Sequence, residues 1–199
     1  MTIERERRKM EYYTIDWLGP FTYDELSDFD PEKYAKWANS TLYMIAGIRK
    51  WQNEKNVQYV GQTKQTCSVR AKQHFSYQNS VDKKFSKIKK ARFWIGTYDS
   101  VFKKSNQDDL KKELNRLEHT LIHCSYLFAN EKILNERAIK HPVQEDITIL
   151  SRFFSKNNPK NVYVRLDRSL REFPDVIMLK SDADERKYYI ANRLTPVGI

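Results

Sequence analysis

The chain has 199 residues, of which 40% are hydrophobic and 31% are charged. It is long and apolar enough for one packed domain with a small appendage, which excludes a chain that is disordered throughout. It contains no apolar run of the roughly 20 residues that a membrane helix needs. We therefore expect a globular protein that has no membrane partner.

The cysteines and the first residues indicate a cellular compartment. Cys67 and Cys124 are the only two cysteines, too few for the disulfide framework of a small secreted domain. The first eight residues are mostly charged and lack the apolar segment of a secretory signal. We expect a reducing, cytoplasmic location.

The placement of the net charge of +10 is more informative than its size. From Arg49 to Lys112 there are 16 lysines and arginines against 5 acidic residues, so the rest of the chain holds 20 against 21. Most lysine-rich segments are ordinary solvated surfaces. An excess of positive charge beside a candidate site instead favours a polyanionic partner. We expect that partner to be nucleic acid.

The first 39 residues are predicted to form a helical lead. Tyr13–Trp17 has the residue types of an edge strand, and Gly19-Pro20 is a turn. Thr22–Glu25 fits a capping box at the start of a short helix. Asp30-Pro31 then begins a second short helix that ends near Trp37.

A hairpin is predicted next. The runs Thr41–Gly47 and Val57–Thr63 are short, rich in strand-forming residues and separated by the polar segment Arg49–Asn56. A helix is predicted from Thr66 to Asn79. Its apolar stripe has helical spacing and consists of Cys67, Ala71 and Phe75.

A basic run with interleaved apolar residues covers positions 83–90, and residues 91–97 are predicted as a third strand. The run either follows a phosphate backbone or is an ordinary exposed lysine face. The predicted nucleic-acid contacts are lysines of this run and one lysine after the hairpin: Lys64, Lys83, Lys84, Lys87, Lys89 and Lys90.

A long helix is predicted from Asn106 to Phe128. Glu118 interrupts its apolar side, where a carboxylate is costly unless it meets a cation or a metal, so it is the best candidate for a metal ligand. His119 and His123 form an i, i+4 pair that could bind zinc, but a place on the polar face or a contact to DNA is favoured. The buried side is predicted to hold Leu110, Leu114, Leu117 and Leu121.

Residues 147–199 are predicted to form a β-rich extension. A short apolar segment at 147–154 and a loop at 155–159 precede three short strands at 162–166, 176–179 and 188–190. We therefore divide the chain into a helical lead (1–39), a central domain (40–146) and the extension (147–199).

Four side chains of the central domain have the character of a site. Tyr43 and Tyr59 each lie on one strand of the hairpin, and Arg70 and His74 lie four residues apart on one face of the next helix. Each alone is more often structural. Two phenols, a guanidinium and an imidazole beside a sheet edge together indicate function.

These elements, in this order, resemble the GIY-YIG nuclease family between Ser40 and Glu136. Thr41-Leu42-Tyr43 stands where the family has Gly-Ile-Tyr, and Tyr59-Val60-Gly61 stands for Tyr-Ile-Gly. The other matches are the arginine and histidine of the next helix, the glutamate of the later helix and the closing asparagine, here Arg70, His74, Glu118 and Asn135.

Some positions depart from the family pattern. Thr41 replaces the first glycine, the loop between the tyrosines is long, and Gln62 stands where lysine is common. Lys64 could supply that charge only in another strand register. None of these departures removes a residue that the chemistry needs.

The resemblance implies an α+β fold in which a small central three-stranded antiparallel sheet is flanked by helices. It also implies phosphodiester hydrolysis with one divalent metal. Glu118 would bind Mg²⁺ or Mn²⁺, and Arg70 would hold the scissile phosphate. Tyr43, helped by the metal, Arg70 or His74, would orient or deprotonate the attacking water.

Two further roles follow from the same resemblance. Tyr59 would complete the ring of hydrogen bonds, and Asn135 would position backbone or water. The expected function is a metal-dependent endonuclease on double-stranded DNA, of restriction or anti-phage type. A homing or repair nuclease and a non-catalytic nucleic-acid-binding module are the alternatives, and a homodimer is expected where both strands are cut.

Overall fold

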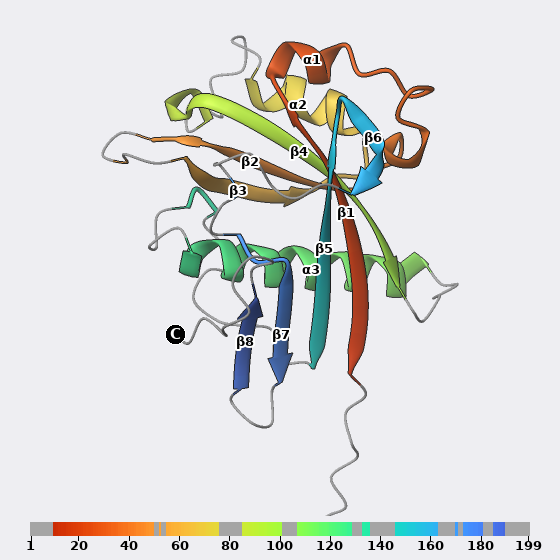
Figure 1. Cartoon of the computed structure of the whole chain (residues 1–199), viewed down its shortest axis with the longest axis vertical. Helices are drawn as coiled ribbons and strands as arrows, with labels where there is room; N and C mark the ends of the chain where they lie inside the picture. The colour runs from red at the N-terminus through yellow and green to blue at the C-terminus, as the bar shows by residue number, and fades with distance from the viewer. Residues whose placement is uncertain are drawn as a thin grey trace, which may run out of the picture.

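The computed structural model describes residues 10–49, 52, 55–75, 85–100, 107–128, 133–135, 146–162, 170, 173–180 and 185–189 (Figure 1). Within these residues, eight strands form one mixed sheet in the order β3-β2-β4-β1-β5-β7-β8, with β6 paired to β5. The strands are β1 (Glu11–Phe21), β2 (Leu42–Ile48), β3 (Asn56–Gln62), β4 (Lys89–Ser100), β5 (Ile147–Ser155), β6 (Asn158–Val162), β7 (Val176–Lys180) and β8 (Glu185–Tyr189). The helices are α1 (Tyr23–Ser27), α2 (Cys67–Phe75) and α3 (Gln107–Phe128), with 3₁₀ turns η1 (Ala35–Trp37) and η3 (Phe85–Lys87).

The prediction of a small central three-stranded sheet with a β-rich appendage is wrong. Strands β3, β2 and β4 are antiparallel neighbours, but β4 also pairs with β1, and β1 pairs in parallel with β5. The predicted edge strand at Tyr13–Trp17 is therefore part of a central strand. The lead, the central domain and the extension all contribute strands to the same sheet, and their boundaries stay a prediction.

The physical reason for this error is the distance along the chain between paired strands. In the parallel pair, Trp17 lies opposite Phe153, and its indole N–H donates a hydrogen bond to Ser151 Oγ at 3.3 Å, 134 residues away. A parallel pair needs a long crossover connection, and local periodicity does not name the partner of a strand.

Helices cover both faces of the sheet. One face packs against α3 through a cluster that includes the fully buried Trp17, Trp94, Leu117 and Leu121. The other face packs against α1, η1 and α2 through a second cluster. In Figure 1, α1 and α2 lie at the top of the view and α3 crosses below them. The strands β2 and β3 run across this view whereas β5, β7 and β8 run down it, as a strongly twisted sheet requires.

Several local predictions are confirmed. The capping box at Thr22 is present: Glu25 N donates to Thr22 Oγ1 at 3.2 Å, and Thr22 N donates to Glu25 Oε2 at 2.7 Å. Asp30 Oδ1 accepts hydrogen bonds from the two backbone N–H groups that follow Pro31, but the segment continues as turns and η1 instead of an α-helix. The predicted strands of the hairpin are β2 and β3.

Other predictions need correction. The third strand is longer than predicted at both ends, because β4 spans Lys89–Ser100. Helix α3 has nearly the predicted bounds, but Leu110 is 39% exposed because the first turns of the helix lie on the surface. Strand β6 begins at Asn158, where a loop was expected. His123 is buried, so it does not lie on the polar face.

Two negative findings apply to the part of the chain that the structure describes. It contains no helix that is both long and apolar enough to span a membrane. Cys67 and Cys124 are both buried and form no disulfide.

Candidate functional site

The two tyrosines of the hairpin lie together on the face of the sheet that α2 covers. Tyr43 of β2 is buried, and Tyr59 of β3 packs beside it with ring centroids 5.8 Å apart. They are diagonal neighbours, because Tyr43 pairs with Gly61 and Ile45 pairs with Tyr59. The ring of Phe85 meets Tyr59 edge to face, with centroids 4.9 Å apart.

Gly61 provides the space that the Tyr43 hydroxyl occupies. A Cβ atom at position 61 would lie 2.6 Å from both Cζ and the hydroxyl oxygen of Tyr43, and 2.8 Å from Cε1 of Tyr59. The glycine of the Tyr-Val-Gly motif is thus required by close approach of a side chain to the backbone. Its position fixes the phenol against the end of β3.

Arg70 extends from α2 to the same phenol. Its side chain is hydrogen-bonded to Tyr43, and its Nη1 also donates to Gln73 Oε1 at 3.0 Å. Burial raises the pKa of Tyr43 and the neighbouring Tyr59 adds to this, whereas Arg70 opposes it. Tyr43 therefore keeps its proton near neutral pH, which favours an orienting role over a role as a base.

Glu118 reaches the end of β3 from the other side, on α3. Gln62 holds both of its carboxylate oxygens: Gln62 N donates to Oε1 at 3.0 Å and Gln62 Nε2 donates to Oε2 at 2.9 Å. The same Nε2 also donates to Asn115 Oδ1 at 2.5 Å. Burial raises the pKa of Glu118, while Gln62 and the nearby His119 lower it.

The Tyr43 hydroxyl and the Glu118 carboxylate approach the same two residues of β3. Tyr43 contacts the position of a Cβ on Gly61 at 2.6 Å, and Glu118 accepts the N–H of the next residue at 3.0 Å. With standard backbone dimensions, the two side-chain oxygens lie within about 10 Å of each other. Such a span can hold one phosphate group and a metal ion.

Asn135 covers the outer edge of β3. Val60 N donates to Asn135 Oδ1 at 3.0 Å, and Asn135 Nδ2 donates to Val60 O at 2.7 Å. Leu134 N donates to Gln58 O at 2.6 Å on the same edge. Together with Glu118, these groups satisfy backbone atoms that an edge strand would leave open. Glu118 and Asn135 therefore have a structural role whatever else they do.

The remaining predicted residues are placed as follows. His74 belongs to α2, but its side chain lies outside the described set, as do Lys83 and Lys84. The other predicted nucleic-acid contacts, Lys64, Lys87, Lys89 and Lys90, are exposed. The structure thus brings together Tyr43, Tyr59, Arg70, Glu118 and Asn135 around the end of β3.

The sequence motifs do not identify Gln62 as the residue that holds the carboxylate, or Asn115 as the residue that accepts a hydrogen bond from Gln62. In the sequence motif, Gln62 stands out only as a departure from the usual lysine, and Asn115 lies outside the motif. Two signals were available: Gln62 directly follows the motif glycine, and Asn115 precedes Glu118 by three positions, which puts both side chains on one face of the helix.

Comparison of the chain with known protein families, with curated proteins and with solved structures finds no match. The resemblance to GIY-YIG nucleases therefore stays a prediction from the sequence motifs.

The surroundings of the Glu118 carboxylate are compatible with a Mg²⁺ ion bound by a single carboxylate. Within the described ranges there is no group of three or more His, Cys, Asp or Glu side chains that could hold a metal ion. Mg²⁺ does not need such a group, because it keeps several waters and takes further ligands from a substrate phosphate. Each oxygen of Glu118 accepts one hydrogen bond from Gln62 and retains a second lone pair. A single-carboxylate Mg²⁺ site is compatible with this arrangement.

Proposed function

We propose that the chain is a divalent-metal-dependent DNA endonuclease that hydrolyses phosphodiester bonds. One observation carries the proposal: a phenol, a guanidinium and a half-buried carboxylate from three different elements meet at residues 61 and 62 of β3. Core packing alone does not require this combination of groups, because each is costly to bury without a partner.

The side chains divide the work as follows. Arg70 binds the scissile phosphate, since its guanidinium offers several donors in a plane and is already held at Tyr43. Tyr43, protonated, orients the attacking water or a phosphate oxygen through its hydroxyl. Tyr59 fixes the ring of Tyr43 by packing against it, and Asn135 fixes β3.

Glu118 would hold the metal ion, Mg²⁺ or Mn²⁺, with water and phosphate oxygens as the other ligands. When bound, the ion stabilises negative charge on the leaving oxygen. Gln62 keeps the carboxylate facing the end of β3, beside the phenol.

The substrate class follows from the charge. Helix α2 and the first eight residues of β4 contain no Asp or Glu and hold Arg70, Lys72, Lys89, Lys90 and Arg92, while β2 and β3 carry no charged residue. This surface favours double-stranded DNA as the partner. We place the protein in the cytoplasm as a restriction or anti-phage enzyme that acts as a homodimer when it cuts both strands, with homing or repair as the neighbouring possibility.

A second function, a non-catalytic nucleic-acid-binding module, is favoured by one observation. Glu118 and Asn135 both bond the backbone of β3, so the fold alone gives a reason for them. Such a module would bind DNA with the same basic surface but would never cut it.

The test is cleavage of supercoiled plasmid DNA with Mg²⁺. The wild type should nick or cut the plasmid, and Glu118→Gln should reduce cutting to a small residual rate but retain binding. Asp109→Asn is the matched control, because it removes the same charge from an exposed position on the same helix. Binding without any cutting by the wild type would support the non-catalytic module. Unchanged cutting by Glu118→Gln would refute the metal role.

A further inference from the structure

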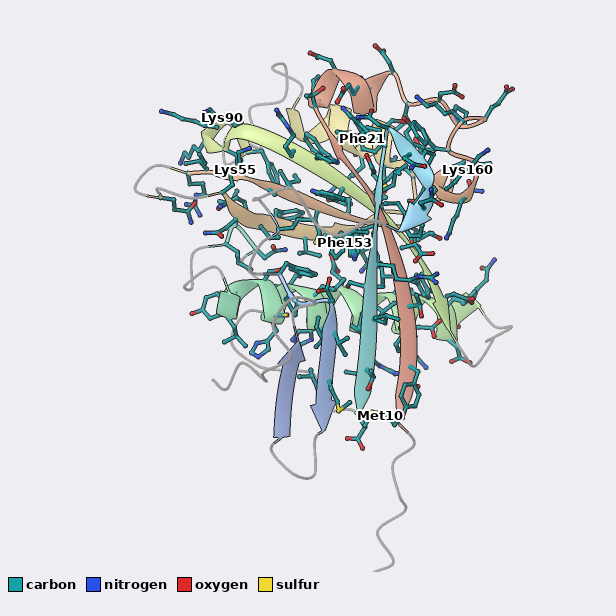
Figure 2. The ribbon with its side chains drawn as sticks, in the orientation of Figure 1. Met10, Phe21, Lys55, Lys90, Phe153 and Lys160 are labelled. Atoms are coloured by element: carbon teal, nitrogen blue, oxygen red, sulfur yellow. The ribbon has the colours of Figure 1, made fainter. Side chains whose placement is uncertain are left out.

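One end of the β3-β2-β4 sheet carries a group of cations that we name the basic end. It consists of Arg49, Lys55, Lys89 and Lys90, which lie at the end of β2 and at the starts of β3 and β4. The register brings these positions together, because Ile48 pairs with Lys89 and Gly47 pairs with Asn56. Figure 2 shows Lys55 and Lys90 at the same end of the sheet.

The basic end is separated from the candidate site by a fixed distance along the strands. Tyr43 pairs with Ile95 near one end of β2, and Ile48 pairs with Lys89 at the other. The five residues from Tyr43 to Ile48 span about 17 Å at about 3.4 Å per residue. In a DNA duplex this equals roughly five base-pair steps of about 3.4 Å.

The lysines of the basic end are available to a ligand. Lys89 and Lys90 are exposed, and neither they nor Lys55 form an ion pair with any residue that the structure describes. In contrast, Lys36 pairs with Asp16 and Lys156 pairs with Glu25 elsewhere on the surface. Lysines that form no ion pair with the described residues remain available to the phosphates of a polyanion.

The backbone of Lys90 gives an independent indication. Its φ of 54° is the only positive value for a non-glycine residue among those described. This conformation suits glycine or asparagine, and a lysine there is strained. Lys90 lies where the register between β2 and β4 shifts, so a bulge in β4 accounts for this conformation and places an exposed cation at the basic end.

From these observations we propose that a DNA duplex lies along the direction of β2 and β4. Its scissile phosphate would sit at Tyr43, Arg70 and Glu118, and the basic end would grip the phosphate backbone about five base pairs away. The position of the cut in this proposal depends on the proposed nuclease function. Binding of the phosphate backbone by the basic end does not depend on it. It adds Arg49 and Lys55 to the contacts expected from the sequence and gives the duplex an orientation.

The first experiment measures binding of a 30-base-pair duplex by fluorescence anisotropy over a series of salt concentrations. The test variant changes Arg49, Lys55, Lys89 and Lys90 to Gln. The matched control changes four cations that the structure places away from the basic end: Lys33, Lys111, Lys112 and Lys160. The test variant should reduce the slope of log K against log salt by roughly 3 to 4, at about 0.9 per phosphate contact. Equal loss in the control would overturn the proposal.

Lys90→Gly separates binding from folding. It should weaken DNA binding several-fold and leave the melting temperature unchanged or higher, because glycine accepts the positive φ. A lower melting temperature with unchanged binding would show that Lys90 is structural and would overturn its assigned contact.

The orientation is tested with an iron chelate attached to Lys90→Cys, since both native cysteines are buried. Strand scission by the chelate should centre roughly five base pairs from the cut that the wild type makes. Scission centred on the cut itself, or more than about ten base pairs away, would contradict the orientation. If the wild type makes no cut, the nuclease proposal fails, while loss of binding in the test variant still supports the grip.

Discussion

Gly61→Ala is the substitution whose consequence follows most directly from the geometry. The added methyl group would lie 2.6 Å from the Tyr43 hydroxyl, whereas ordinary contacts begin near 3.4 Å. The ring of Tyr43 is buried and also contacts Tyr59, so it cannot rotate away freely. It must move by about 1 Å, and overpacking of this kind costs about 1–3 kcal/mol.

Two effects should be measured together. The melting temperature should fall by about 2–12 °C, at 2–4 °C per kcal/mol for a chain of this length. Single-turnover cleavage of plasmid DNA, well below the melting temperature, should fall about 100-fold, because a displacement of 1 Å at a reacting centre costs that much.

Gly96→Ala is the matched control. Its added methyl group would lie 2.7 Å from the buried ring of Trp17, on the face of the sheet that packs against α3, so it should reduce stability to a similar degree. Cleavage should be retained in this variant. If Gly61→Ala and Gly96→Ala have the same activity at equal folded fraction, the Tyr43 hydroxyl has no special role.

Asn135→Ala should reduce the free energy of unfolding by about 2–4 kcal/mol in urea, because Val60 N and O each lose a buried partner; a change below 0.5 kcal/mol would contradict the edge role. Because burial raises the pKa of Glu118, its ionisation opposes folding, so the wild type should lose stability relative to Glu118→Gln as the pH rises from about 4 to 8. A constant difference across a urea series at those pH values would refute this. Burial raises the pKa of Cys67 to about 12 and that of Cys124 well above its usual range, so neither thiol should react with a disulfide reagent at pH 8 before unfolding. Removal of divalent metal with EDTA should abolish cleavage and leave the melting temperature unchanged, whereas residual cleavage would exclude a metal requirement.

The local elements of the fold could be predicted because their causes are local. The hairpin at Thr41–Thr63 shows strand-forming runs, the capping box at Thr22 has its residue types, and α3 has leucines at helical spacing. Glu118 among those leucines was expected to meet a cation or a metal; the structure gives it hydrogen bonds from Gln62, and the metal role stays a prediction. Each of these inferences uses residues that are close in sequence.

The long sheet could not be predicted for the opposite reason. The middle of β1 is buried on both faces. Because Asp16 interrupts the apolar run of β1, the sequence pattern predicts an edge strand there instead of a central strand. The carboxylate of Asp16 is satisfied by Arg152 through hydrogen bonds of 2.6 and 2.8 Å, from a residue 136 positions later. No sequence pattern within β1 identifies Arg152 as the partner of Asp16. The central position of β1 and its pairing with β5 therefore could not be predicted from the sequence.

We propose that Tyr43 and Glu118 act in one site on one phosphate. The direct measurement is the single-turnover rate of plasmid cleavage with Mg²⁺ for Tyr43→Phe, Glu118→Gln and the double variant. Residues that act as a unit have non-additive effects, so the double variant should be no slower than Glu118→Gln alone, within about threefold. Losses that multiply, or a wild type that does not cut DNA, would contradict the account.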